Sequence, residues 1–459
     1  MELEGKKVLV VGFGKTGEAV CEFLMKKKAA VKISEKREAS QITEKIMAWT
    51  ERGVVFETGG HQRASFLEAD LIVPSPGVPP IAELKDALAQ GVEIISEIEL
   101  AFRYLKGKVI GITGTNGKST TASLTHQILK NGGIKSFLAG NIGTPLIRFV
   151  EASKDDHFYV TELSSFQLEY VKQFRASISV FLNVTPDHLD WHQNFDRYFA
   201  AKRRLVELQT GHDKAVLNRD DPLVWGLNKE LDPSVFGFSR ETSTSPGCCI
   251  ENNCLVCSND DHDVNESIIH IKDIPLPGVH NLENVLAAVS VGKLLKVPPS
   301  TIKSSVINFK GLEHRLEKVT VLKDVIFYND SKATNVGATL KSIQSFDQRI
   351  VLILGGRDKG GNFEMLREPA SHRVKEIILL GEARDKIAEV LRNGIPIQIA
   401  SSLKEAVELG FAAASPGEIV LLAPACTSFD MFANFEERGR VFKREVMAMK
   451  DRFTAKGKS

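Results

Sequence analysis

The sequence predicts an α/β protein of three domains, each built on a sheet of parallel strands. The chain has 459 residues, a length that suggests about three domains with a hydrophobic core each. Short apolar runs ending in Gly, Ala or Pro alternate with helical patterns, which is typical of parallel α/β sheets. We expect the domains to span residues 1–105, 106–310 and 311–459.

The composition is that of a globular protein with almost balanced charge. Lys and Arg number 59 and Asp and Glu 58, for a formal net charge of +1, which argues against bulk binding to nucleic acid or to an anionic membrane. No apolar run approaches the ~20 residues that cross a bilayer. Residues 1–12 lack the features of a signal peptide. We therefore expect a cytoplasmic monomer with no membrane span and no nucleic-acid partner.

The first predicted strand runs into a glycine-rich turn within residues 7–17, KVLVVGFGKTG, and residues 18–28 have helical spacing. A GxGxxG turn lets a phosphate approach the backbone at a helix N-terminus. A second strand over 31–34 ends at Glu35, whose carboxylate can accept hydrogen bonds from a sugar or base. A further strand and a Pro/Gly-rich loop occupy residues 70–80. These features predict a Rossmann-like nucleotide-binding domain, with a tight strand–helix packing turn as the alternative.

The second sheet opens at residue 109 with VIGITGTNGKST, and helical spacing resumes over 122–129. Backbone N–H groups of such a loop surround phosphate oxygens, Lys118 neutralises their charge, and a hydroxyl group reaches Mg²⁺. The spacing departs from GxxxxGK[ST] because Ile112 stands where the first glycine would be. We predict a central P-loop domain that binds ATP.

Two further strand ends in the central domain carry polar side chains. Glu162 ends a short β-branched run, where a carboxylate can hold a phosphate-bound Mg²⁺. His188 follows a predicted strand over 178–182. The HxxxH spacing of His188 and His192 would fit a zinc protease, but Leu189 occupies the position of the required Glu. We therefore favour magnesium chemistry over a zinc site.

The third segment contains three clear strands, over 350–354, 376–380 and 419–422. Residues 385–392 form an amphipathic pattern that stops at an Asn-Gly pair. Residues 402–405, SLKE, have the spacing of a capping box at the start of the next helix. The third domain is therefore predicted to be doubly wound and Rossmann-like as well.

Six cysteines are too few for a disulfide scaffold, and we expect them to be reduced. Four of them cluster, at Cys248, Cys249, Cys254 and Cys257. The last two form a CxxC pair, but a second pair is missing, and His262 and His270 lie at no familiar ligand spacing. We interpret the cluster as an incidental surface hairpin without a metal.

A set of motifs in this order, TGTNGKST, TELSSFQLE, NVTPDHLDWH, YFAAKRRL, HNLENVLAA, GLEHRLE and NDSKATN, resembles the Mur ligase family of ATP-dependent amide-forming enzymes. Within the family, NDSKATN and LLAPACTSFDMF are similar to the branch that joins D-glutamate to UDP-N-acetylmuramoyl-L-alanine, since other branches carry different residues at 331–335. The resemblance covers nearly the whole chain. It implies a ligase of peptidoglycan precursor synthesis that forms an acyl phosphate and a tetrahedral intermediate and releases ADP and phosphate.

The resemblance also implies which residues act on ATP and metal. Those assigned to catalysis are Lys118, Glu162, His188, Lys202, His314 and Arg315. Those assigned to two Mg²⁺ ions are Ser119, Glu162, His188 and a carbamylated Lys202. Carbamylation is physically sensible because an ammonium group cannot bind a cation, whereas a carbamate offers anionic oxygen. Without the resemblance, Lys202 would be interpreted as a solvated lysine on a helix.

The remaining assignments concern the substrates. For ATP they are Gly114, Thr115, Asn116, Gly117, Lys118, Ser119, Thr120, Asn281, Asn284, Arg315, Asp330 and Lys332. For the UDP-substrate they are Lys15, Thr16, Glu35, Lys36, Ser75, Gly77 and Asn141. For D-glutamate they are Thr334, Lys359, Ser428 and Phe435. A core aromatic is the alternative for Phe435.

Three other functions stay open at this point. A dehydrogenase would account for the GxGxxG turn and Glu35, but not for TGTNGKST or NDSKATN. A sister ligase would add another amino acid to another nucleotide-linked or folate acceptor. A non-enzymatic nucleotide-binding scaffold would have no need for Glu162, His188 and Lys202 together.

Overall fold

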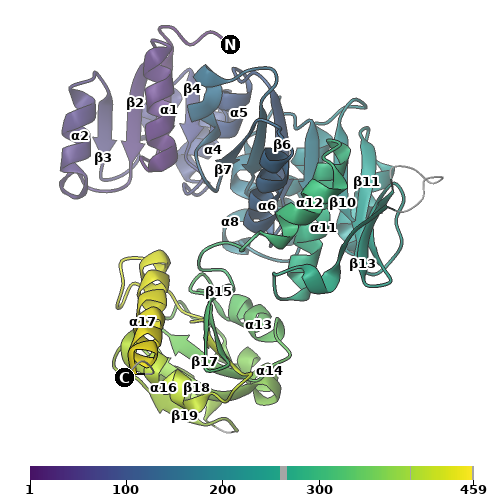
Figure 1. Ribbon diagram of the computed structural model, residues 1–459. Helices are drawn as coiled ribbons and strands as arrows, with labels where there is room; N and C mark the ends of the chain where they lie inside the picture. The colour runs from purple at the N-terminus through teal and green to yellow at the C-terminus, as the bar shows by residue number, and fades with distance from the viewer. Residues whose placement is uncertain (259–265, 393, 457–459) are drawn as a thin grey trace. The chain divides into compact units, whose positions relative to one another are not determined.

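The computed structural model of the chain describes residues 1–258, 266–392 and 394–456 (Figure 1). Its strands form three sheets, and the predicted three-domain α/β fold is confirmed. The chain divides into two compact units, Met1–Ile274 with Leu282–Phe309, and Pro275–Asn281 with Lys310–Ser459. The first unit holds two of the sheets, so the boundary predicted at residue 105 lies inside it and stays a prediction.

The first sheet is entirely parallel, in the order β3-β2-β1-β4-β5. Its strands are β1 (Lys7–Val11), β2 (Ala30–Glu35), β3 (Val55–Thr58), β4 (Leu71–Pro74) and β5 (Glu93–Ile94). Its helices are α1 (Lys15–Lys26), α2 (Thr43–Thr50), α3 (Arg63–Leu67), α4 (Ala82–Ala89) and α5 (Glu97–Phe102), with a 3₁₀ turn at Ala39–Gln41. Alternate residues of β1 enter opposite cores: Val8 and Val10 one, Leu9 and Val11 the other. Burial on both faces explains why β1 reads as a continuous apolar run.

The second sheet has nine strands in the order β14-β13-β12-β11-β10-β9-β6-β8-β7, antiparallel only at β12-β13-β14. The strands are β6 (Lys108–Thr113), β7 (Ser136–Gly140), β8 (Phe158–Glu162), β9 (Ile178–Phe181), β10 (Lys214–Asn218), β11 (Ser234–Ser239), β12 (Gly247–Glu251), β13 (Cys254–Ser258) and β14 (Glu266–His270). Because β6, β8 and β9 are neighbours, the loops after them open at one edge of the sheet, where ligands of parallel sheets bind.

Helices cover both faces of this sheet (Figure 1). They are α6 (Lys118–Asn131), α7 (Ser165–Glu169), α8 (Leu189–His192), α9 (Phe195–Glu207), α10 (Pro222–Gly226), α11 (Val279–Leu294) and α12 (Pro299–Ile307), with 3₁₀ turns at Leu146–Ala152, Leu227–Lys229 and Ile271–Asp273. Helix α6 begins at Lys118, so the whole GTNGKST segment lies between β6 and the first turn of this helix.

The third sheet has six strands in the order β15-β16-β20-β17-β18-β19. They are β15 (Glu317–Leu322), β16 (Val325–Asn329), β17 (Ile350–Gly355), β18 (Val374–Leu380), β19 (Ile397–Ile399) and β20 (Ile419–Leu422). All pairings are parallel except β15 with β16. The three predicted strands are confirmed. The other three were missed: β15 and β19 are half-exposed or short edge strands, and β16 alternates buried with partly exposed residues, so none of them is a fully buried strand.

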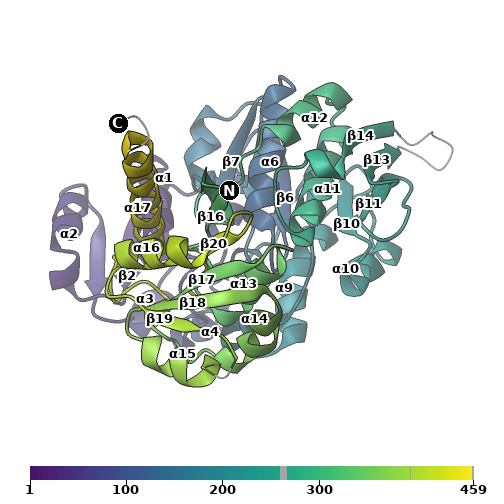
Figure 2. The ribbon, with the colours of Figure 1, turned by 60° about the horizontal axis from the view of Figure 1, so that its bottom comes forward.

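The helices of this unit are α13 (Val336–Gln344), α14 (Arg367–Arg373), α15 (Arg384–Leu391), α16 (Leu403–Ala413) and α17 (Phe435–Lys456), with a 3₁₀ turn at Phe363–Leu366. Figure 2 shows α16 and α17 packed side by side. Ser402 caps α16 by accepting a hydrogen bond from Glu405 N, but the Glu405 side chain bonds to Ser401, so the predicted capping box is only half formed. In the described part of the chain, no helix has both the length and the apolar character to cross a bilayer.

The cysteine cluster differs from its prediction. β12 and β13 do form a hairpin, but Cys248, Cys249 and Cys257 are buried, and Cys254 is partly exposed. Cys248 and Cys257 stand opposite each other and form a disulfide, although reduced thiols were expected. The hairpin is not superficial because β12 also pairs with β11 and extends the central sheet. His262 lies outside the described residues.

Candidate functional site

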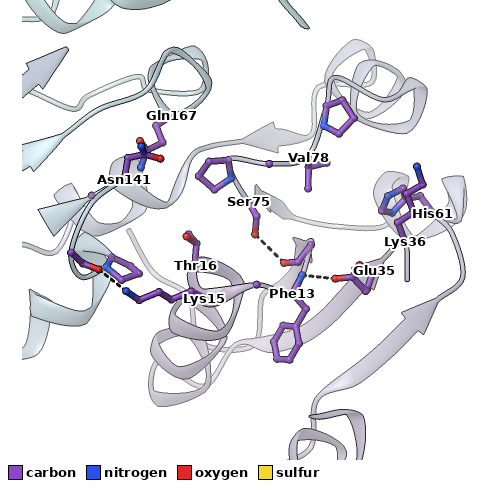
Figure 3. A pocket seen from close by; sticks show the side chains of 18 residues that line it. Phe13, Lys15, Thr16, Glu35, Lys36, His61, Ser75, Val78, Asn141 and Gln167 are labelled. Atoms are coloured by element: carbon purple, nitrogen blue, oxygen red, sulfur yellow. Dashed lines mark hydrogen bonds between the residues drawn. The ribbon is translucent and has the colours of Figure 1, made fainter. Parts of the chain in front are cut away.

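A cavity of about 500 Å³ lies in the first unit, at the carboxyl ends of β1 and β4 and beside the loop after β7 (Figure 3). All residues that the sequence assigned to the UDP-substrate line it: Lys15, Thr16, Glu35, Lys36, Ser75, Gly77 and Asn141. The sequence prediction missed His61 and Gln167, which line the same cavity. Gln167 lies in the motif TELSSFQLE, so its place there was a usable signal. The structure therefore brings the predicted set together around one cavity.

The glycine-rich turn after β1 could serve close strand–helix packing or ligand binding, and its glycines show that it suits both. Gly12 has φ +83°, and a Cβ on Gly17 would lie 2.2 Å from the Gly12 carbonyl oxygen, so Gly17 serves close packing. A Cβ on Gly14 would meet nothing within 4 Å, which leaves this side of the turn open. The turn therefore packs tightly on one side and offers backbone to a ligand on the other.

Glu35 holds this turn together from the end of β2. Its Oε2 accepts hydrogen bonds from Phe13 N (2.8 Å) and Arg37 Nη2 (2.9 Å), and its Oε1 accepts one from Arg37 N (3.0 Å). Burial opposes ionisation, but the bonds from Arg37 and Phe13 outweigh it and lower the pKa of Glu35 to about 2. The carboxylate is thus a structural acceptor here, in addition to any contact with a sugar or base.

Two hydrogen bonds drawn in Figure 3 connect the cavity walls. Lys15 Nζ donates to the Gly143 carbonyl oxygen (2.5 Å), which joins α1 to the loop after β7. Ser75 Oγ donates to the Gly12 carbonyl oxygen (2.9 Å), which joins the loop after β4 to the turn. The cavity therefore uses residues from both sheets of the first unit.

The predicted phosphate-binding loop, residues 114–120 between β6 and the first turn of α6, is called the phosphate-type loop below. It folds back on its own lysine. Lys118 Nζ donates to the carbonyl oxygens of Gly114 and Thr115, both at 2.9 Å. Gly117 has φ +86°, and a Cβ there would lie 2.0 Å from Asn284 Oδ1, so Asn284 packs directly on the loop. The N-terminal N–H groups of α6 and the Lys118 side chain both lie at this loop, which is an arrangement that suits phosphate.

Lys202 lies beside this loop and is almost fully buried, with 1% of its surface exposed. Its Nζ donates to the Gly114 carbonyl oxygen (2.8 Å) and lies 4.7 Å from the centre of the Tyr198 ring. Burial, reinforced by the nearby charge of Lys118, holds the pKa of Lys202 well below its usual range. The interpretation as a solvated lysine is therefore wrong.

Glu162 ends β8 at the same edge of the sheet. Its Oε1 accepts a hydrogen bond from Asn141 Nδ2 (2.8 Å), whereas its buried Oε2 has no hydrogen-bond partner among the described residues. A buried carboxylate oxygen without a partner is costly, and a hard cation is the ligand that satisfies it best. The residues present therefore fit Mg²⁺.

The two histidines of the HxxxH spacing do not act together. His188 is exposed, and its ring contacts Phe166 with centroids 4.9 Å apart. His192 is buried, and its Nε2 is hydrogen-bonded to Ser165 Oγ (2.9 Å) while its ring stacks on Phe166. This use of His192 agrees with rejecting a zinc protease.

The predicted residues of the second unit follow the carboxyl ends of three adjacent strands. Asp330 and Lys332 come after β16, Ser428 after β20 and Lys359 after β17, so they gather at one edge of the sheet. Lys332 Nζ lies 3.9 Å from the ring centre of Phe435, which is partly exposed, so Phe435 is not a core aromatic. Burial raises the pKa of Asp330 to about 6, although its bond from Ser342 opposes this.

His314 and Arg315 differ in exposure. His314 is 2% exposed, its Nδ1 is 2.9 Å from Asn329 Nδ2, and its buried Nε2 has no hydrogen-bond partner among the described residues. Arg315 is exposed. Asn281, assigned to ATP together with Asn284, belongs to the second unit and donates to the Pro277 carbonyl oxygen (2.6 Å). The predicted ATP-binding residues are therefore shared between the two units.

Comparison with known protein families covers most of the chain. Residues 6–96 match the Mur ligase MurD-like N-terminal domain, residues 112–292 the Mur ligase middle domain, and residues 314–426 the Mur ligase glutamate ligase domain. Two solved structures are similar in fold: UDP-N-acetylmuramate–alanine ligase from Thermotoga maritima (18% identity, TM-score 0.60) and a pseudomurein peptide ligase type C from Methanothermus fervidus (19% identity, TM-score 0.58). Each comparison covers 97% of this chain and 100% of the other.

Curated relatives are more similar in sequence. The chain is 46% identical over 450 residues to the UDP-N-acetylmuramoylalanine–D-glutamate ligase of Acidobacterium capsulatum, which covers 98% of this chain and 97% of the relative. It is 44% identical over 451 residues to the enzyme of the same name from Koribacter versatilis, which covers 98% and 99%. With three matching domains and full-length relatives at this identity, the chain belongs to the Mur ligase family.

Proposed function

We propose that this protein is an ATP-dependent ligase that joins D-glutamate to UDP-N-acetylmuramoyl-L-alanine in cytoplasmic peptidoglycan precursor synthesis, and that it acts as a monomer. The observation that carries the proposal is the cluster of Lys118, Lys202 and Glu162 at one sheet edge, in a chain 46% identical to a ligase of that name. A dehydrogenase has no use for this cluster.

The reaction follows from the chemistry of the groups. A free carboxylate does not form an amide at neutral pH because its leaving group is poor, so the L-alanine carboxylate first attacks the ATP γ-phosphate and gives an acyl phosphate and ADP. The amine of D-glutamate then attacks the acyl carbon, and the tetrahedral intermediate expels phosphate. Lys118 and the N-terminal N–H groups of α6 stabilise the negative charge of the transferring phosphoryl group.

Enzymes of this family use ATP and Mg²⁺, and the residues present fit the metal. Glu162, Ser119, His188 and a modified Lys202 would hold two ions, which when bound offset the repulsion between a carboxylate and a triphosphate. The orphan Oε2 of Glu162 supports this assignment.

The environment of Lys202 supports carbamylation. Burial lowers the pKa of Lys202, which increases the fraction of the neutral amine, the form that attacks CO₂. Lys118 and Lys202 also donate to the same Gly114 carbonyl oxygen, so an anionic carbamate on Lys202 would lie beside the positive charge of Lys118. The carbamate would then supply anionic oxygen for a metal ion.

The other assignments divide between the substrates. Gly114–Thr120 with Asn281, Asn284, Arg315, Asp330 and Lys332 would bind ATP. The seven residues assigned to the UDP-substrate in the sequence, all of which line the cavity, would bind it. Thr334, Lys359, Ser428 and Phe435 would bind D-glutamate, where a lysine and backbone amides suit a dianionic amino acid.

Phosphate release from ATP with UDP-N-acetylmuramoyl-L-alanine tests the function. We expect turnover with D-glutamate and none above background with L-glutamate, L-alanine or L-lysine. Turnover with another amino acid in place of D-glutamate would identify a sister ligase instead. Binding of ATP with no phosphate released under any of these conditions would contradict the proposal.

A further inference from the structure

Arg438, on the first turns of α17, is a buried cation, 2% exposed. Within the described residues its side chain donates to two backbone carbonyl oxygens and one hydroxyl oxygen, and to no carboxylate. Burial lowers the pKa of Arg438 to about 10, with Asp430 opposing this from nearby. Removing a cation from water costs free energy, so a buried arginine indicates that its hydrogen bonds have a specific role in the fold.

The guanidinium group of Arg438 bridges two loops. Its Nη2 donates to the Ser331 carbonyl oxygen (3.0 Å) and its Nε to Ser331 Oγ (3.0 Å), both in the loop after β16. Its Nη1 donates to the Cys426 carbonyl oxygen (3.1 Å), in the loop after β20. One planar group thus fixes both loops at once, which its rigid fork of donors allows.

Both loops carry residues assigned to ligands. Ser331 lies between Asp330 and Lys332, and Cys426 lies two residues before Ser428. A direct hydrogen bond from Ala425 N to the Ala333 carbonyl oxygen (2.9 Å) keeps the loops in contact. Their relative position therefore decides where the polar groups of the two loops stand.

The surrounding packing leaves Arg438 little freedom. Ser331 Oγ donates to the Phe435 carbonyl oxygen (2.8 Å), which ties the same loop to the start of α17. A Cβ on Gly356 would lie 3.2 Å from Arg438 Nη1, and one on Gly439 would lie 2.1 Å from His314 Nδ1. These close approaches leave no room for a side chain at either glycine.

We propose that Arg438 is a positioning residue that sets the loop carrying Asp330, Lys332 and Thr334 against the loop carrying Ser428, and so shapes the site for the amino acid and the nucleotide. The inference rests on the proposed function. Arg438 acts through the two loops and need not touch a substrate.

Kinetics of Arg438→Met and Arg438→Lys in the full-length enzyme test this. Because hydrogen bonds from a charged donor to both loops are lost, we expect Arg438→Met to raise the KM for D-glutamate by about tenfold or more. Lysine keeps the charge but its single amino group cannot replace the three nitrogen donors that bond to both loops. Arg438→Lys should therefore have a KM for D-glutamate between those of Arg438→Met and the wild type. The affinity for the UDP-substrate should not change, since its cavity lies in the first unit.

Two controls keep the outcome interpretable. Arg444→Met removes an exposed arginine of the same helix that pairs with Glu445, and should leave the KM for D-glutamate unchanged. Ser331→Ala removes one of the three contacts and should raise this KM less than Arg438→Met. In the double variant, Ser331→Ala should raise the KM for D-glutamate by a smaller factor than it does in the wild-type enzyme, because Ser331 and Arg438 share a hydrogen bond.

The result that would overturn the inference is an Arg438→Met enzyme with unchanged KM for D-glutamate and ATP, or full recovery in Arg438→Lys. An unfolded Arg438→Met variant would shift the test to Ser331→Ala, where an unchanged KM would equally overturn it. Failure of the wild-type enzyme to ligate D-glutamate would instead contradict the proposed function.

Discussion

Glu97, at the start of α5, is a buried acid that lies in none of the motifs identified in the sequence. It is 2% exposed, and its Oε1 accepts a hydrogen bond from Ile147 N (2.7 Å). Burial raises its pKa to about 7, and the bonds from the backbone N–H groups of Ile147 and Leu146 only reduce that effect. Since the segment before Ile147 contains cavity residues such as Asn141 and Gly143, Glu97 supports the loop that lines the cavity.

At this residue we expect a pH-dependent stability. The folded state binds the proton of Glu97 more tightly than the unfolded chain, so the stabilisation is complete below pH 4.5 and is lost as pH rises to 7, by about 3 kcal/mol. In Glu97→Gln the free energy of unfolding should no longer fall over this pH range. Urea unfolding at pH 5 and pH 7.5, followed by the fluorescence of Trp49, Trp191 and Trp225, which all lie in the first unit, measures it. Parallel pH profiles of variant and wild type would contradict the assignment.

Lys202 gives a second prediction at the residue scale. Lys202→Ala should lose nearly all turnover, and acetate or formate should restore part of it by supplying the missing oxygen ligand. Lys202→Arg should stay inactive, because a guanidinium group keeps the charge but cannot be carbamylated. Lys214→Ala, at an exposed lysine of the same unit, is the control. Full activity of Lys202→Arg in phosphate-release assays would argue against a carbamate.

At the scale of elements, the strand-to-helix connections determine the sites. The phosphate-type loop joins β6 to α6, the cavity turn joins β1 to α1, and α17 holds the loops after β16 and β20. In each case the residues predicted to bind a ligand follow the end of a parallel strand, where backbone groups stop pairing with neighbouring strands.

The loop between β6 and α6 can be tested by comparing Gly117, just before α6, with Gly133, just after this helix. Both have positive φ, +86° and +77°, so alanine at either position costs about 1–2 kcal/mol of backbone strain. Only at Gly117 would the new Cβ also collide, 2.0 Å from Asn284 Oδ1, whereas nothing lies within 4 Å at Gly133. We therefore expect Gly117→Ala to raise the KM for ATP about tenfold or more. Gly133→Ala should lower only the melting temperature, and equal KM values for the two variants would refute this role of the loop.

At the scale of the whole molecule, the residues predicted to bind ligands are divided between two compact units. The cavity lined by the residues assigned to the UDP-substrate and the phosphate-type loop belong to the first unit, whereas Lys359, Ser428 and Phe435, assigned to D-glutamate, belong to the second. Such a division allows the binding of each substrate to be tested separately.

Lys118→Ala should therefore abolish turnover while leaving the affinity for UDP-N-acetylmuramoyl-L-alanine within about twofold of wild type, since the cavity lining contains no part of the phosphate-type loop. Isothermal titration with the UDP-substrate and phosphate release with all substrates measure the two effects. Lys15→Ala is the reciprocal control, which should weaken UDP-substrate binding. Loss of that binding in Lys118→Ala would contradict the division of roles.

Much of the fold could be predicted from local pattern. The strands β1, β6, β17 and β20 are buried on both faces, so they appear in the sequence as largely apolar runs that end in turn residues. The edge strands β15 and β19 are partly exposed and carry no such signal. The cysteine hairpin was misjudged because its burial depends on the partner strand β11, which sequence pattern does not reveal.

By itself the sequence determined the order of α/β elements, the phosphate-type loop and membership of a ligase family, because strand burial and glycine-dependent turns leave local, ordered signatures. Only the tertiary structure decided that Lys202 is buried against Gly114, that Glu162 keeps an oxygen without a partner, and that Arg438 joins two loops from 107 and 12 residues away. Burial and long-range hydrogen bonds depend on which elements pack together, and that information is not contained in any one segment of the chain.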